Sequence, residues 1–430
     1  MNLESFLRGI LGIAVLVGVL YLFSSKKKDI NWKLVSLGFF LQIAFAVGII
    51  HIPFVAALFD KISSFFVVIL DFTRQGSNFV FGGLLNVNSF GFIFAFQILP
   101  TIIFFSALTS LLFYLGILQK IVYGLSWIMG KFLKISGAEN LSTTANIFLG
   151  QTEAPLLIKP YLPKMTRSEI LCVMVGGMAN TAGGVLAAYV GFLGGNDPVQ
   201  QLFFAKHLLA ASVMSAPATI VVSKMLLPQT EEIDEKIELT EEKVGSNIIE
   251  AIAVGTEDGL KLAFNVGSML IVFIAMIAMV NYLLSDVLGY YTGLNDVIVN
   301  LTGGQYNGLT LQFVLGYVCA PFVWLLGIAK SDMVHIGQLL GEKTILNEFV
   351  AYTTLGKMKE SGVLQDPKSI IMATYILSGF ANFSSIGIQV GGIGALAPSK
   401  RGMLSELGWK ALLGGTIASL LTATIVGMLT

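Results

Sequence analysis

Long uncharged apolar segments divide this chain, and they limit its fold more than any other feature. A helix that crosses a lipid bilayer needs about 20 apolar residues in a row. The run from Gly9 to Ser25 is uncharged, and seven later segments are long enough to cross: residues 34–59, 90–115, 170–196, 202–227, 262–285, 369–399 and 411–430. Charged residues make up 12% of the chain, about half their usual share in soluble domains. The sequence therefore predicts an all-α polytopic membrane protein with about eight transmembrane helices.

Two other segments mix charges with apolar residues and are predicted to lie along the membrane surface. Residues 54–81 carry four charges among aromatic residues, and residues 117–140 space three lysines as an amphipathic helix does. Residues 229–243 hold seven acids against two lysines and are predicted to be a solvated loop. Three lysines follow the first apolar run, which favours a retained helix over a signal peptide and places the N-terminus outside.

The chain contains an internal repeat of short polar motifs inside apolar segments. Gly177-Met-Ala-Asn180 matches Gly379-Phe-Ala-Asn382, and small or flexible residues follow each motif. Each motif is preceded by an apolar segment that turns at Leu-Gly and then carries an acid. That acid is Glu153 in the first unit, and the sequence suggests Asp332 in the second. A hairpin with an acid and an interrupted helix with an asparagine are therefore expected twice.

Interrupted helices in matching places of two halves indicate a transporter. Non-helical backbone at membrane depth has to be buried in protein or to line a water-filled cavity, and paired interruptions mark the binding site of many transporters. A channel is more often lined by a ring of like residues along one pore. Close helix packing explains the glycines, but it does not explain an asparagine and an upstream acid in both units.

The polar residues near the interruptions favour a neutral solute that is rich in hydroxyl or amide groups. Glu153 and Asp332 are costly to bury and are therefore candidate ligands, although an ion pair, with Lys330 in the case of Asp332, is the alternative. Neutral donors and acceptors are supplied by Gln151, Thr152, Asn382 and Ser385. These segments contain no arginine, so a nucleoside fits better than an anion. Phe380 is a candidate to cover the base, although ordinary packing explains it better on sequence alone.

A second group of polar residues is suited to a monovalent cation. Such a site needs clustered oxygen atoms from carbonyls freed at a helix break and from Asn or Thr side chains. One hairpin tip and one helix break carry Asn146, Leu149, Asn180 and Thr181. The alternative is that these asparagines only cap helices. Basic and acidic residues number 26 each, which argues against nucleic acid, and two cysteines with three histidines suggest no zinc or haem cofactor.

Three motifs resemble the signatures of the concentrative nucleoside transporter family. They are NIFLGQTEAP at residues 146–155, NEFVAY at residues 347–352 and GFANFSSIG at residues 379–387. The motifs are long and occur in the family's order, and the resemblance extends over about residues 90–430.

This resemblance implies a sodium-coupled nucleoside importer in a bacterial inner membrane, without enzyme activity. It implies a homotrimer whose protomers have eight spans, two re-entrant hairpins and an inverted repeat with broken helices, in which a transport domain moves against a scaffold domain as an elevator. The residues implied at the base are Gln151, Thr152, Glu153 and Val185. Those implied at the ribose are Asp332, Asn382 and Ser385, with Phe380 against the nucleoside. The residues implied at sodium are Asn146, Leu149 through its carbonyl, Asn180 and Thr181.

On this basis we expect four regions along the chain. Residues 1–116 form the first transmembrane helices of the scaffold, and residues 117–228 form an interfacial helix, the first hairpin and the first broken helix. Residues 229–296 comprise the acidic loop and a long scaffold helix. Residues 297–430 comprise the second hairpin, the second broken helix and the last helix.

Two positions depart from the family pattern. Ala329-Lys330-Ser331-Asp332 stands where many bacterial members resemble Pro-Trp-Asn-Glu, and Asn180 stands where Ser or Thr is usual. The retained Asn146 favours sodium, and proton coupling is the alternative. The competing functions are a transporter of another neutral solute, such as a nucleobase, and an intramembrane protease that uses the two acids as a pair.

Overall fold

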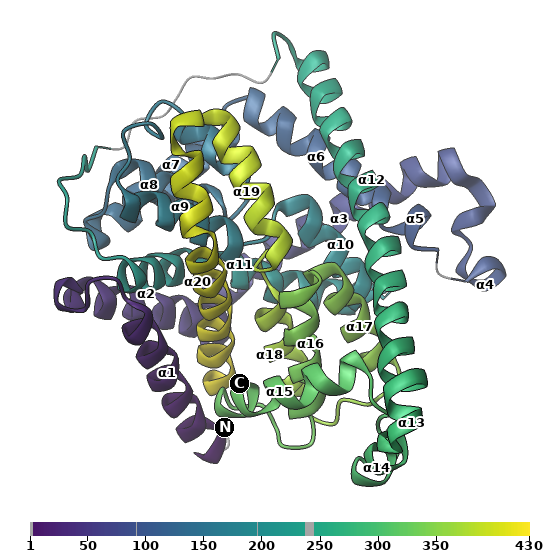
Figure 1. The fold of residues 1–430 in the computed structure, drawn as a ribbon. Helices are drawn as coiled ribbons and strands as arrows, with labels where there is room; N and C mark the ends of the chain where they lie inside the picture. The colour runs from purple at the N-terminus through teal and green to yellow at the C-terminus, as the bar shows by residue number, and fades with distance from the viewer. Residues whose placement is uncertain (1–2, 92, 196, 237–244) are drawn as a thin grey trace.

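The computed structural model describes residues 3–91, 93–195, 197–236 and 245–430, and helices form the regular structure of these ranges (Figure 1). Within these ranges, eight helical segments are long and apolar enough to cross a membrane, which confirms the polytopic all-α prediction. The set differs from the predicted one in two places. Residues 369–399 form two shorter helices, and Pro53–Leu85 is long and apolar enough to be counted. The location of this segment along the membrane surface stays a prediction.

The helices follow one another in four groups. The first group contains α1 (Leu3–Phe23), α2 (Trp32–His51), α3 (Pro53–Phe81), α4 (Val87–Phe90), α5 (Phe94–Gln97) and α6 (Leu99–Tyr114). The second contains α7 (Ile117–Leu133), α8 (Gly137–Ala145), α9 (Arg167–Ala179), α10 (Gly183–Gly194) and α11 (Pro198–Leu226). The third contains α12 (Ile248–Asn281), α13 (Tyr290–Thr292) and α14 (Leu294–Leu301). The fourth contains α15 (Leu311–Leu325), α16 (Met333–Ile345), α17 (Glu348–Glu360), α18 (Pro367–Leu377), α19 (Phe383–Leu396) and α20 (Arg401–Leu429).

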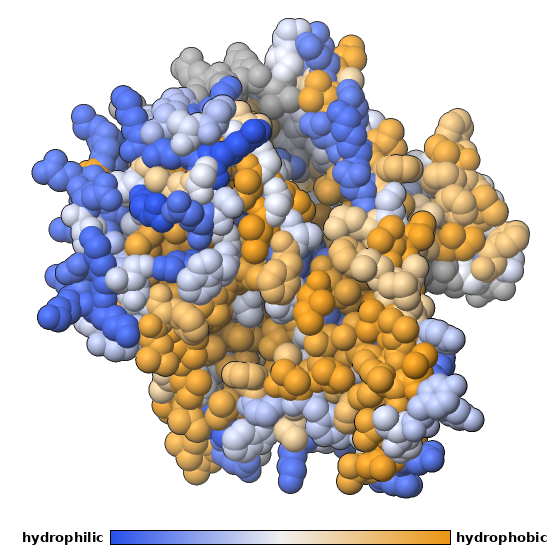
Figure 2. All heavy atoms as spheres, viewed as in Figure 1, coloured by the Kyte–Doolittle hydropathy of each residue, from blue (hydrophilic) through white to orange (hydrophobic). Residues whose placement is uncertain are grey.

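The face seen in Figure 2 carries a broad band of hydrophobic residues, with hydrophilic residues gathered above and below it. On α12, Phe264 and Ile271 are 72% and 73% exposed. Contiguous apolar surface of this kind marks a face that water does not cover in the working protein. Of the acidic segment 229–243, residues 237–244 lie outside the described part; Glu231 and Glu232 before them are exposed, as expected of a solvated loop.

The long helix α12 packs along α6, away from the buried centre of the molecule (Figure 1). Two glycines four residues apart permit the close approach: a Cβ at Gly255 would lie 2.5 Å from Ser110 Cβ, and one at Gly259 would lie 2.8 Å from Ile103 Cα. Ser110 Oγ also donates to the Ala251 carbonyl at 2.7 Å. Small residues at this spacing are typical of tightly packed membrane helices.

The described part of the chain contains two helical hairpins, and the position of the second differs from the prediction. In the first, α8 leads through a tip at residues 146–153 into a 3₁₀ turn, Ala154–Ile158. The second consists of α16 and α17, with its tip at Leu346 and Asn347. The sequence had placed this hairpin around residues 326–332, where the chain does turn at Gly327 (φ +103°). That turn only connects α15 to α16, so the acid at the second tip is Glu348.

Both predicted helix interruptions are present, and they contact each other. The first separates α9 from α10 after Asn180, and the second separates α18 from α19 before Asn382. Gly379 N donates to Thr181 Oγ1 at 2.9 Å. Gly379 has φ +90°, and a Cβ there would lie 2.6 Å from the Met178 carbonyl oxygen, so this position requires glycine. The two sequence motifs therefore meet at one place inside the protein.

Candidate functional site

The tips of both hairpins, both helix breaks and one face of α12 enclose a cavity of about 410 Å³. This volume is within the range of small-molecule sites. Seven of the eight residues that the sequence assigned to a substrate line it: Gln151, Thr152, Glu153, Val185, Phe380, Asn382 and Ser385. The structure therefore brings together groups that lie more than 200 positions apart in the chain.

The first hairpin tip presents an amide and a carboxylate. Glu153 Oε2 accepts a hydrogen bond from Gly150 N at 3.1 Å, which fixes the carboxylate beside the turn. Gln151 Nε2 lies 3.4 Å from Ser385 Oγ, to which it donates, while Gln151 Oε1 has no partner among the described residues. A Cβ at Gly177 would lie 2.8 Å from Gln151 Cβ, so glycine is what lets the tip approach the first broken helix.

The second carboxylate in the cavity is Glu348, which sequence reasoning missed. It is the first residue of α17, directly after Asn347, whose side chain caps the helix by accepting from Val350 N at 2.9 Å. Asn382 Nδ2 donates to Glu348 Oε2 at 2.7 Å. Asn382 Oδ1 in turn accepts from Ser385 N at 2.9 Å and caps α19. The sequence did contain a signal for this residue, because Glu348 belongs to the NEFVAY motif.

Asp332 does not join this cavity, and its predicted place there has to be corrected. The side chain is fully buried at the start of α16, where its two carboxylate oxygens accept from Gln365 N and Asp366 N, each at 3.0 Å. Both oxygens are thus occupied by the segment that leads into α18. Lys330 is exposed, and the part of the chain that the structure describes shows no ion pair between it and Asp332.

The residues expected at a cation lie around the first hairpin tip and the first break. Asn146 caps the end of α8 and donates through Nδ2 to the Ser142 carbonyl at 3.0 Å. A Cβ at Gly176, one helical turn before Asn180, would lie 3.1 Å from Asn146 Nδ2. Within the described ranges, Asn146 Oδ1 and both polar atoms of the Asn180 side chain are buried without a hydrogen-bond partner.

This donor set fits a hard cation. Buried polar atoms are rarely left unpaired in native proteins, and carbonyl and amide oxygens are the ligands that such ions take. Leu149 is buried within the tip, and Thr181 lies directly after Asn180, where its hydroxyl already accepts from Gly379 N. The side-chain oxygens of Asn146 and Asn180 are therefore available to an ion.

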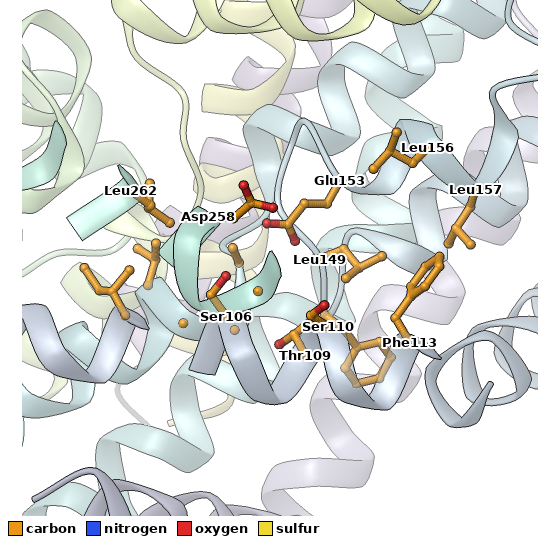
Figure 3. A pocket seen from close by; sticks show the side chains of 17 residues that line it. Ser106, Thr109, Ser110, Phe113, Leu149, Glu153, Leu156, Leu157, Asp258 and Leu262 are labelled. Atoms are coloured by element: carbon orange, nitrogen blue, oxygen red, sulfur yellow. The ribbon is translucent and has the colours of Figure 1, made fainter. Parts of the chain in front are cut away.

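A second cavity of about 280 Å³ adjoins the first and shares with it Glu153, Ala182, Val185 and Leu262. Glu153 from the hairpin and Asp258 from α12 point toward each other across it, with Ser106 and Ser110 of α6 below (Figure 3). Glu153 therefore faces both cavities, between the hairpin and α12. Asp258 lies outside the repeated units, so the repeat gave no reason to select it.

Paired hairpins and broken helices that meet at one polar cavity, within a polytopic helical protein, define a membrane transporter. The comparisons with known families agree. Residues 11–84 match the Na+ dependent nucleoside transporter N-terminus, residues 95–196 match a nucleoside recognition (Gate) domain, and residues 207–427 match the Na+ dependent nucleoside transporter C-terminus. The chain belongs to the Na+ dependent, or concentrative, nucleoside transporter family.

Curated relatives support this assignment, two of similar length and one longer. The nucleoside permease NupC of Helicobacter pylori is 37% identical, with 99% of this chain and 98% of the permease covered. An uncharacterized transporter of Haemophilus influenzae is 40% identical over 99% of this chain and 98% of its own length. Sodium/nucleoside cotransporter 1 of Mus musculus is 37% identical over 97% of this chain, which spans 63% of the mouse protein.

Solved structures of the transporter CNTnw have the same fold. Its inward-facing substrate-bound state has a TM-score of 0.88 and 35% identity, with 99% of this chain and 97% of CNTnw covered. A variant in an intermediate state has a TM-score of 0.90 and 35% identity, with all of both chains covered. The protein is thus a multi-pass transporter of the bacterial plasma membrane and not an enzyme, so the protease alternative is discarded.

Proposed function

We propose that this protein imports nucleosides by sodium symport through an elevator-type movement. The observation that carries the proposal is that two carboxylates, Glu153 and Glu348, line one cavity whose described lining contains neither lysine nor arginine. Carboxylates that face no lysine or arginine in such a site repel anions and accept strongly from hydroxyl and amide donors. A nucleoside offers hydroxyls on the ribose and N–H groups on the base.

The proposed roles divide the cavity between its two hairpins. The first hairpin and first broken helix receive the base, through Gln151, Thr152, Glu153 and Val185. The second hairpin and second broken helix receive the ribose, through Glu348, Asn382 and Ser385. Phe380 lies against the nucleoside. Glu348 takes the ribose role that the sequence had given to Asp332, because only Glu348 lines the cavity.

We propose that the coupling ion is sodium, held by Asn146, the Leu149 carbonyl, Asn180 and Thr181. The ion would join the first hairpin tip to the first helix break, and both of these carry residues of the base site. Sodium binding therefore stabilises the positions of the hairpin tip and helix break that bind the nucleoside. Symport requires such coupling between the binding of ion and substrate. Proton coupling is the alternative, but the polar atoms left unpaired there are amide groups, which do not titrate.

The elevator proposal rests on which residues line the boundary between α12 and the two repeated units. On the α12 side the cavity is lined by Leu262, Val266 and Met269, together with Asn265 and Ser268. Side chains without fixed polar partners permit one group of helices to slide past another. In this proposal, α1–α6 and α12 form the scaffold of a homotrimer, and the two repeated units, residues 117–228 and 297–430, move together.

Uptake by proteoliposomes tests the function. Labelled uridine and adenosine are offered with a sodium gradient and a proton gradient imposed separately. With a sodium gradient alone, the nucleoside is expected to accumulate above its outside concentration. Accumulation driven by a proton gradient alone would show that the coupling ion is the proton and not sodium. Competition distinguishes the solutes: unlabelled nucleosides are expected to block uptake and free nucleobases to leave it unchanged. Block by nucleobases alone would overturn the nucleoside assignment.

A further inference from the structure

A buried tyrosine behind the cavity joins the two repeated units. Tyr189 lies in α10, the second half of the first broken helix, and its side chain is fully buried. It does not belong to the described lining of the substrate cavity, so it stands behind the site instead of facing the substrate. Its aromatic neighbours include residues of the second hairpin. Any influence of Tyr189 on binding to the second half of the site therefore passes through that hairpin.

The helices α10 and α17 pack closely, although they belong to different units. A Cβ at Gly356 of α17 would lie 2.9 Å from the Phe192 carbonyl oxygen of α10, so glycine permits the close approach. Lys359 Nζ donates to the Leu193 carbonyl at 2.7 Å, near the end of α10. The second hairpin is thus attached to the first broken helix by contacts along α17.

Within this contact, Tyr189 packs against two aromatic rings of α17. Its ring stacks on that of Tyr352, with centroids 4.0 Å apart and planes inclined by 22°, and it meets the ring of Phe349 edge-on at 5.3 Å and 67°. Such pairs have a defined geometry. Tyr352 is anchored in turn, because its hydroxyl donates to the Thr374 carbonyl of α18 at 2.8 Å. The ring of Tyr189 is therefore held in one orientation.

The hydroxyl of Tyr189 interacts with the carboxylate of Glu348, the first residue of α17. Among the described residues, however, this hydroxyl has no partner at hydrogen-bonding geometry. A buried tyrosine hydroxyl usually has one, and leaving such a group unpaired costs free energy. A buried donor that is not yet used thus lies beside the carboxylate to which we assign the ribose.

Glu348 already receives one hydrogen bond, from Asn382 Nδ2 to Oε2. A second donor, from a different helix, determines where the other oxygen points. We propose that Tyr189 is a positioning residue for the ribose site, whose hydroxyl donates to the Glu348 carboxylate when that carboxylate engages the substrate. The bond connects α10, which carries Val185 of the base site, to the hairpin that receives the ribose. The inference rests on the proposed ribose role of Glu348.

The first test removes the hydroxyl with Tyr189→Phe, which keeps the ring and its stack. Uridine is compared with 2′,3′-dideoxyuridine, which lacks the ribose hydroxyls at these two positions. The KM for uridine is expected to rise about 5- to 10-fold, with little change in the maximal rate, whereas uptake of the dideoxy compound should not change. The preference for uridine then falls by the same factor. An unchanged preference would overturn the proposal.

The matched control is Tyr352→Phe. It removes the other hydroxyl of the stacked pair, the one that donates to the Thr374 carbonyl, and leaves both rings in place. Its expected effect is lower stability, with the preference for uridine over the dideoxy compound preserved. If both variants altered this preference equally, the effect would come from the packing of the pair, and the proposed role of the Tyr189 hydroxyl would be wrong.

Thermal unfolding in detergent separates a positioning role from a structural one. The Tyr189 hydroxyl has no hydrogen-bond partner within the described ranges. Without substrate, Tyr189→Phe should therefore unfold at the same temperature as the unaltered protein. With uridine, it should gain less stability than the unaltered protein gains. A large loss of stability without substrate would make the hydroxyl a structural group and would overturn the proposal.

Glu348→Gln distinguishes this inference from the function on which it rests. Adding Tyr189→Phe to Glu348→Gln should change the preference for uridine little further, because the hydroxyl acts through the carboxylate. If the added change lowered the preference by its full factor again, the inference would fail while the ribose role of Glu348 stood. A Glu348→Gln protein that kept the whole preference would contradict the proposed ribose role itself, and the inference with it.

Discussion

Asn382 Nδ2 donates to Glu348 Oε2 across 2.7 Å, and this hydrogen bond joins the second hairpin to the second helix break inside the cavity. The Oδ1 atom of the same asparagine accepts from Ser384 Oγ at 2.6 Å and from Ser385 N at 2.9 Å. Because both ends of the amide are used, Asn382 fixes the direction of the Glu348 carboxylate. The carboxylate is then oriented before any substrate arrives.

Replacing this carboxylate should weaken transport strongly. A hydrogen bond to a charged group contributes about 1.5–3 kcal/mol, so Glu348→Gln is expected to lower uridine uptake at low substrate concentration by roughly 10- to 100-fold. Initial rates of labelled uridine uptake at saturating sodium measure this. Asp332→Asn is the control, and it should change stability more than transport. Loss of uptake in Asp332→Asn with normal uptake in Glu348→Gln would return the ribose role to Asp332.

Phe380 should contribute through its ring. An aromatic contact is worth about 0.5–1.5 kcal/mol beyond its buried area, so Phe380→Leu is expected to raise the half-saturating nucleoside concentration by roughly 2- to 10-fold, with little change in the sodium requirement. Concentration series with uridine and adenosine test this. Phe383→Leu alters an exposed ring three residues on, outside the cavity lining, and should leave both values unchanged. Equal effects of the two changes would argue against a role for Phe380 in binding.

The sequence predicted the parts of the fold that depend on local pattern. Apolar length identified the long helices, and the paired Gly-x-Ala-Asn motifs located both breaks, because glycine and asparagine tolerate the irregular backbone there. The second hairpin was predicted around residues 326–332 and not at α16 and α17, since Glu342 and Lys343 interrupt the apolar pattern of α16. Both side chains are buried in the structure. A charged side chain can be buried when its partners lie far away in the chain, and the local sequence pattern does not reveal such burial.

The choice of Asp332 over Glu348 has the same origin. Asp332 followed a Leu-Gly turn, as Glu153 does, so the local context appeared equivalent. What separates the two acids is their partners: Asp332 accepts from the backbone of residues 365 and 366, and Glu348 accepts from Asn382 in the cavity. Asp258 on α12 was likewise not predicted, because only the packing of α12 beside the first hairpin brings it near Glu153 (Figure 3).

The sodium assignment predicts a selective effect of Asn146. Asn146→Leu keeps a side chain of similar size but removes its amide oxygen. It should raise the half-saturating sodium concentration about tenfold, the effect of losing one interaction of roughly 1.4 kcal/mol. Sodium activation curves of uridine uptake measure this. Asn140→Leu is the control on the same helix, since Asn140 Nδ2 donates to the Ser126 carbonyl at 2.8 Å. It should lower stability while keeping the sodium requirement, whereas identical curves for both variants would remove Asn146 from the site.

The contact between the two breaks predicts intolerance to a methyl group. Gly379→Ala would place Cβ 2.6 Å from the Met178 carbonyl oxygen at φ +90°, so a loss of stability of about 1–3 kcal/mol is expected. Gly391→Ala, in α19, meets nothing within 4 Å and should be neutral or slightly stabilising. Thermal unfolding in detergent compares them. A Gly379→Ala protein as stable as the unaltered one would mean that the breaks can separate at no cost.

The buried ion pair between Glu139 and Lys224 predicts that removing one charge destabilises the protein more than removing both charges. The Nζ–Oε2 distance is 2.6 Å, the side chains are 0% and 5% exposed, and Lys224 also donates to Ser168 Oγ at 3.0 Å. Removing one partner leaves a buried charge unpaired, so Lys224→Met should cost about 3–5 kcal/mol. Glu139→Gln combined with Lys224→Met should recover most of that loss, because no lone charge remains.

Equilibrium unfolding in mixed detergent micelles measures the single and double variants of this pair. Arg167 and Glu406 form the exposed counterpart, 2.8 Å apart with side chains 49% and 63% exposed, and Arg167→Gln should cost less than about 1 kcal/mol because water screens the pair. The burial argument requires the double variant to be more stable than Lys224→Met alone. If the two losses simply added, the pair would not be coupled, and the cost would have to come from the packing of the lysine stem between α8, α9 and α11.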